Sequence, residues 1–66
     1  MHVVECLESE RGWGQEYTYR GFDTKEEAMD EVERISALNP PGPVPNWYMV
    51  AEYKGIMEEL PLGYKV

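Results

Sequence analysis

The chain has little with which to reinforce a small fold through covalent bonds or a metal. Its 66 residues include one cysteine, Cys6, and one histidine, His2. A single cysteine excludes an internal disulfide, and one cysteine with one histidine cannot complete a closed zinc site. A domain of this size buries only about 60% of the surface that its unfolded chain exposes. We therefore expect reinforcement from self-association or a tight partner, although some domains of this size are stable alone.

Basic residues are also scarce. Six Lys and Arg stand against 13 Asp and Glu, which gives a net charge of −7. Phosphate backbones and anionic membrane surfaces repel such a chain, so we expect no direct binding to nucleic acid or lipid. No apolar run approaches the roughly 20 residues that a membrane span needs, and residues 1–10 lack the basic and apolar regions of a signal peptide. These features predict a cytoplasmic location.

The sequence contains no recognisable motif for catalysis or cofactor binding. His2 and Cys6 are four residues apart on a predicted strand, which places them on one side of it but about 13 Å apart. Cys6 is therefore interpreted as a small core hydrophobe. Gly12-Trp13-Gly14 is not followed by the Lys-Ser/Thr pair of a phosphate loop, and no calcium-loop pattern is present. We expect no enzyme activity, no cofactor and no metal.

The best local signal is a helix that begins after Thr24. Thr24 and Glu27 fit a capping box, in which the threonine is the N-cap and the glutamate reaches back from the third helical position. The helix is predicted to end near Leu38, because the prolines that follow cannot continue it. With 100° per residue, one side is apolar and the opposite side is charged. The apolar side consists of Ala28, Met29, Val32, Ile35 and Ser36.

Three strands are predicted around this helix, at residues 2–8, 15–22 and 47–54. Residues 9–14 form a hairpin loop, the proline-rich residues 39–46 form a crossover, and Gly55 ends the third strand. The fold class is therefore α+β, with ββαβ order in a single domain over 1–66. Its core is residues 1–55, and 56–66 is a tail with a turn around 57–60 and a possible short edge strand at 62–66. A right-handed crossover favours an antiparallel sheet of order 2-1-3, whose second face the helix leaves uncovered.

The charged side of the helix is the first candidate contact surface. Negative charges on a rigid helix can imitate the phosphates of a nucleic acid and occupy a basic groove of a partner protein. The plain alternative is a solvated acidic surface that serves solubility. The candidate residues are Glu26, Glu27, Asp30, Glu31 and Glu33.

The aromatic residues are the second candidate surface, because they exceed what a small sheet and one helix can bury. Ordinary core packing explains part of them, and the remainder can form an exposed patch on the sheet. Tyr and Trp dominate the binding energy of protein interfaces. The candidate residues are Trp13, Tyr17, Tyr19, Trp47 and Tyr53.

The segment Tyr19–Val32 resembles a strand-to-helix element of small ββαβ proteins encoded by bacteriophages and mobile elements. These include acidic inhibitors of host enzymes and anti-CRISPR proteins. The resemblance covers 14 of the 66 residues and transfers no functional residue. It implies a phage-type inhibitor of a host nucleic-acid enzyme, acting in the host cytoplasm.

These observations predict a non-enzymatic protein-binding module. Its partner would be a larger protein, such as a basic nucleic-acid-binding enzyme, held by the acidic helix side, the aromatic sheet face, or both. The alternative is a small structural or regulatory domain that forms a homodimer through the open sheet face.

Overall fold

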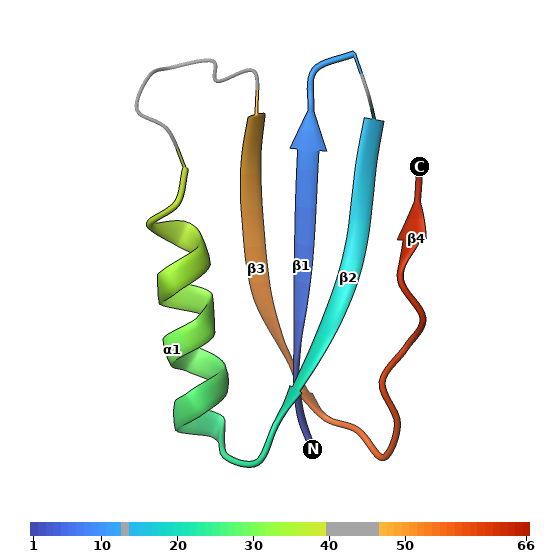
Figure 1. Cartoon of the computed structure of the whole chain (residues 1–66). Coiled ribbons are helices and arrows are strands. Elements are labelled where there is room, and N and C mark those ends of the chain that lie inside the picture. Colours follow the sequence, from blue (N-terminus) through green and yellow to red (C-terminus); the bar gives the residue numbers. More distant parts are fainter. Residues whose placement is uncertain (13, 40–46) are drawn as a thin grey trace.

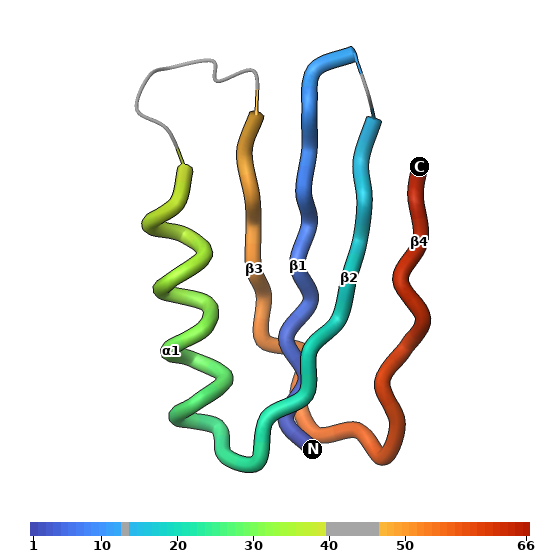
Figure 2. Tube along the Cα trace, in the orientation of Figure 1, coloured from blue at the N-terminus to red at the C-terminus, as the bar shows by residue number. Residues whose placement is uncertain are grey.

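A computed structural model describes residues 1–12, 14–39 and 47–66 as one α-helix and a four-stranded sheet (Figure 1). The element order is β1 (His2–Glu10), β2 (Gly14–Phe22), α1 (Lys25–Ser36), β3 (Trp47–Ile56) and β4 (Tyr64–Lys65). Each strand is antiparallel to its neighbours, in the order β3-β1-β2-β4. The predicted α+β class and the 2-1-3 arrangement of the long strands are confirmed. The tail adds β4 along β2, as the trace in Figure 2 shows.

Helix α1 begins as the capping pattern predicts. The Thr24 hydroxyl oxygen accepts a hydrogen bond from the Glu27 backbone N–H at 3.2 Å. The Glu27 carboxylate accepts the Thr24 hydroxyl at 3.2 Å, whereas the capping box predicted a bond to the backbone of the N-cap residue. The helix ends at Ser36, two residues before the predicted Leu38, and Ala37 is its C-cap.

The strands are longer than predicted, for two local reasons. A tight turn at Arg11–Gly12 allows β1 to continue to Glu10, which pairs with Gly14. Gly55 does not end β3, because it adopts φ +100° where the register with β1 shifts, and the strand runs on to Ile56. Glycine tolerates this conformation at a bulge without a Cβ clash. The predicted aromatic Trp13 and residues 40–46 of the predicted proline-rich crossover lie outside the described residues.

Alternation along the strands gives the sheet one face toward α1 and one away from it. Val4 and Cys6 of β1 pack against Ala28 and Ile35 of α1, and this group forms the core. The helix packs chiefly against β3 and reaches β1 and β2 less (Figure 1). We call the side of the sheet that faces away from α1 the open face. In the described residues, no helix has the length and apolar character needed to span a membrane.

One end of the open face is covered by the chain itself. Val3 points to this face, yet it is completely buried, like its neighbour Val4. Met1 and Leu60 account for this, because their side chains fill the space beside Gly21, which pairs with Val3. Backbone hydrogen bonds between Met1 and Met57 hold the two segments together at this end. The rest of the open face has no such cover among the described residues.

Candidate functional site

A row of apolar and aromatic side chains crosses the open face from one edge of the sheet to the other. Leu7 of β1 is paired with Val50 of β3 on one side and with Tyr17 of β2 on the other. Tyr17 is in turn paired with Tyr64 of β4. We call these four residues the central row. Val50 is 48% exposed and Tyr64 is 49% exposed, so both ends of the row are open to solvent.

The aromatic half of the central row is a stacked pair of tyrosines. The rings of Tyr17 and Tyr64 stack with their centroids 4.6 Å apart and an interplanar angle of 17°. Gly63 permits this approach, since a Cβ at that position would lie 2.6 Å from the Tyr17 carbonyl oxygen. Two backbone hydrogen bonds between Gln15 and Val66 continue the pairing beyond β4. The tail therefore widens the open face by one strand.

The rows on either side of the central row are more polar. Glu5 lies between Tyr19 and Glu52 in the register, and the Tyr19 hydroxyl donates to its carboxylate at 2.8 Å. This hydrogen bond raises the pKa of Tyr19 to about 12. Glu52 has Lys54 as its counter-ion at 3.8 Å. On the other side of the central row, Tyr48, Ser9 and Gln15 are aligned. The charges on the open face are thus few and largely partnered.

The five predicted aromatic residues do not form one surface. Tyr17 and Tyr19 lie on the open face, as the register shows, whereas Trp47 and Tyr53 belong to the side of the sheet that faces α1. Tyr53 packs on the core, its hydroxyl bonds to the His2 ring nitrogen at 2.8 Å, and Lys25 lies 5.4 Å above its ring. Tyr53 is therefore part of the interior packing. Trp13 is outside the described residues.

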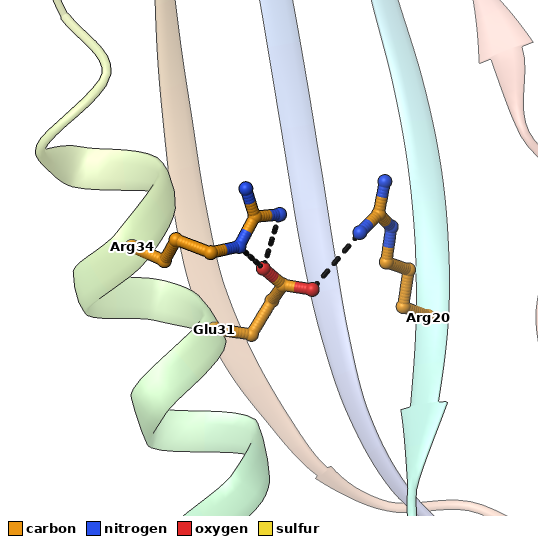
Figure 3. A network of polar contacts seen from close by, with 3 residues as sticks. All are labelled: Arg20, Glu31 and Arg34. Atoms are coloured by element: carbon orange, nitrogen blue, oxygen red, sulfur yellow. Dashed lines mark hydrogen bonds and ion pairs between the residues drawn. The ribbon is translucent and has the colours of Figure 1, made fainter.

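Only four of the five acids predicted for the contact surface on α1 are exposed, because Glu31 is largely buried. The Glu31 side chain is only 10% exposed, and its carboxylate lies between two arginines (Figure 3). Arg20 of β2 donates to it at 2.9 Å, and Arg34 binds it from one turn farther along the helix. Glu31 therefore joins the helix to the sheet. The other four predicted acids are exposed: Glu26, Glu27, Asp30 and Glu33.

Further acids meet at the hairpin end of the sheet, on the side that faces α1. Glu8 and Glu16 are direct cross-strand partners, and Glu10 follows Glu8 on the same side. With Lys65 they line a hollow of about 200 Å³. Lys65 lies 3.9 Å from Glu16 and is the basic residue of this group. The side of the molecule that bears α1 is therefore the more acidic one.

Cys6 and His2, the two residues considered for nucleophilic chemistry, lie apart from each other, and each makes other contacts. Cys6 is buried in the core between Thr18 and Ala51, and burial raises the pKa of its thiol above the usual 9.0. His2 is bonded to Tyr53 at the far end of β1. Among the described residues, no group of three or more His, Cys, Asp or Glu is arranged to hold a metal ion.

The central row depends on residues that sequence reasoning did not select. Leu7, Val50 and Tyr64 were not among the predicted site residues, since their alignment with Tyr17 follows from two strand registers. The sequence did contain one signal for Val50: alternation along β3 places Tyr48 and Val50 on one face of the strand and Trp47 and Tyr53 on the other. Comparisons of the chain with models of protein families, with curated proteins and with solved structures find no match.

Proposed function

We propose that the chain is a non-enzymatic protein-binding module and that it binds its partner through the open face. The observation behind this proposal is the central row, which lays apolar and aromatic side chains across all four strands on the side opposite α1. Contiguous apolar surface of this kind typically marks an interaction site on a soluble protein. Tyrosine is suited to it, because a large ring with two side-chain torsions loses little entropy on binding.

The low charge of the open face supports the same proposal. Interface centres are depleted in charged residues and enriched in aromatic ones. The central row contains no charged residue, and the neighbouring carboxylates are Glu5, bonded to Tyr19, and Glu52, paired with Lys54. Binding at the central row therefore requires little desolvation of unpaired charge.

A capture experiment with matched variants tests the proposal. Val50→Lys puts a charge at the exposed end of the central row, and Met29→Lys makes the same change at an apolar residue of α1 that is 41% exposed. We expect immobilised wild-type chain and Met29→Lys to retain the same polypeptides from a lysate of the source cell, including untagged copies of the chain itself. Val50→Lys should lose them. Equal capture by all three would contradict a role for the open face.

A second candidate surface is the exposed acidic side of α1. Glu26, Glu27, Asp30 and Glu33 form no ion pair with any described residue. Such a surface would suit the basic groove of a nucleic-acid-binding protein, as a mimic of phosphate charge, and an inhibitor of a host enzyme would act in this way. Binding of this kind weakens steeply with salt. Glu26→Lys with Asp30→Lys should then abolish capture, whereas Val50→Lys should not.

A further inference from the structure

The open face suits one occupant in particular. We propose that it binds the open face of a second copy of this chain, in a two-fold symmetric dimer with the two sheets packed face to face. This inference rests on the proposed function and names the partner of the same surface. Three properties support it: the area of the face, the distribution of charge over the molecule, and the order of side chains along the central row.

The area of the open face requires a partner that covers nearly all of it. β1 and β2 are nine residues long and β3 is ten. With about 3.3 Å per residue and about 4.8 Å between strands, the three long strands give a face of roughly 30 by 14 Å, which β4 widens over only part of its length. Its projected area of roughly 400 Å², of which Met1 and Leu60 cover one end, is about half of the roughly 800 Å² that each partner buries in a standard stable interface, so a stable contact has to use nearly all of it. A second twisted sheet of the same size covers such a face completely.

The distribution of charge permits two copies to approach each other. Each chain has a net charge of −7, which would oppose self-association if the acids met at the interface. Among the acids of the strands and the helix, however, only Glu5 and Glu52 lie on the open face. Two sheets pack about 10 Å apart, so the acids on the outer sides of the dimer would be about 20–30 Å from those of the other copy. This exceeds the Debye length of about 10 Å at 0.1 M salt.

The charge also distinguishes a second copy from a basic partner. A basic protein would be drawn to α1 and to the acidic hairpin end, which lie on the other side of the sheet. The open face offers instead a surface of low charge with an apolar and aromatic central row, and its best complement is a surface of the same kind. Sheet-on-sheet packing of two inner faces is a standard way to bury such residues.

The order of residues along the central row is self-complementary. From β3 to β4 the row reads Val50, Leu7, Tyr17, Tyr64, so one half is aliphatic and the other half is aromatic. A two-fold axis parallel to the strands, between β1 and β2, reverses the row in the second copy. Val50 then faces Tyr64 of the partner subunit, and Leu7 faces Tyr17 of the partner subunit. The same axis sets Glu5 over Tyr19 of the partner subunit, so no carboxylate meets its own copy.

Light scattering coupled to size exclusion tests the dimer directly. We expect the wild-type chain at high micromolar concentration to have twice its chain mass of 7.7 kDa, and this mass should persist at high salt. Val50→Lys should give the mass of one chain, and Met29→Lys should remain dimeric. Circular dichroism establishes that each variant is folded. An equimolar mixture of Val50→Lys and Tyr64→Glu should recover the dimer, because one lysine then faces one glutamate.

The outcomes separate this inference from the proposed function. A wild-type monomer at high micromolar concentration overturns the dimer. If Val50→Lys then still abolishes capture of another protein, the open face is a binding site with a different occupant. If capture is also unchanged, both proposals fall. If Val50→Lys remains a dimer and Met29→Lys becomes a monomer, the dimer assembles through α1 and the inference is wrong. If the mixture of Val50→Lys and Tyr64→Glu stays monomeric, Val50 does not lie opposite Tyr64 of the partner subunit.

Discussion

The side chain of Asn39 forms two hydrogen bonds with the backbone of Met49. Its Nδ2 donates to the Met49 carbonyl oxygen at 2.8 Å, and the Met49 N–H donates to its Oδ1 at 2.6 Å. The amide thus imitates one residue of a neighbouring strand at the outer edge of β3. An edge strand presents backbone groups that can pair with another chain, and Asn39 occupies one such position while it fastens the end of α1 to the sheet.

Asn39→Ala should therefore destabilise the fold by about 1–2 kcal/mol, the sum of two modest hydrogen bonds. Asn39→Asp should be more informative, because it keeps the acceptor for the Met49 N–H and replaces the donor with a carboxylate oxygen opposite the Met49 carbonyl. We expect the Asp variant to be less stable at neutral pH than at acidic pH, where the protonated carboxyl can donate. Urea unfolding followed by circular dichroism measures this. Ser36→Ala is the matched control, and an Asp variant as stable as wild type at neutral pH would refute the role.

The ion-pair network around Glu31 makes a second prediction. Its carboxylate is largely buried, whereas the Arg20 and Arg34 side chains are 56% and 55% exposed. Since solvent screens the arginines, the network stabilises the docking of α1 only moderately. Glu31→Gln should cost about 1 kcal/mol in the free energy of unfolding, and part of this loss should vanish in high salt. Glu33→Gln removes the same charge from an exposed residue of α1 and should change stability by less than about 0.5 kcal/mol. Equal effects of the two changes would count against the network.

The helix could be predicted from sequence because its signals are local. Thr24 and Glu27 are three residues apart, and the contact between them is made within one turn. To predict which strand residues lie on which face of the sheet, local information was not enough. Val3 and Val4 are both buried, so β1 shows no alternation that assigns its faces. Part of the cover over Val3 comes from Leu60, more than fifty residues away in the chain, and no local pattern contains that contact.

The candidate site illustrates the same limit. Alternation within β2 correctly places Tyr17 with Tyr19, and alternation within β3 correctly places Trp47 with Tyr53. The relation between the two pairs depends on how β2 and β3 are each aligned with β1, and this alignment puts them on opposite faces. The acidic surface was predicted from helical periodicity alone. Periodicity could not reveal that Arg20 of β2 would bind Glu31.

Cys6 provides a probe of the core. Its thiol is buried between the sheet and α1, and burial raises its pKa above 9.0. A thiol reagent should therefore modify Cys6 far more slowly in the native chain than in urea. The raised pKa also implies that the associated stability is complete below pH 9, the ordinary pKa in the unfolded chain, and is lost as the pH rises above it. Cys6→Ala should remove this pH dependence. Rapid modification of the native chain would show that the core is open.

Tyr19 provides the corresponding probe of the open face. Its hydroxyl donates to Glu5, and this bond raises the pKa of Tyr19 from 10.0 to about 12. The folded state holds the proton more tightly than the unfolded state, so this contribution to stability is complete below about pH 10 and is lost between about pH 10 and pH 12. Carbon NMR of labelled tyrosine rings near pH 10 should find Tyr19 still protonated.

Glu5→Gln should lower the pKa of Tyr19, because a neutral amide accepts less strongly than a carboxylate and adds no negative charge. Tyr48→Phe removes another tyrosine of the open face and should leave the late titration in place. If Tyr19 titrated near pH 10 in the wild-type chain, or kept its late titration in Glu5→Gln, the Tyr19–Glu5 contact would be ruled out.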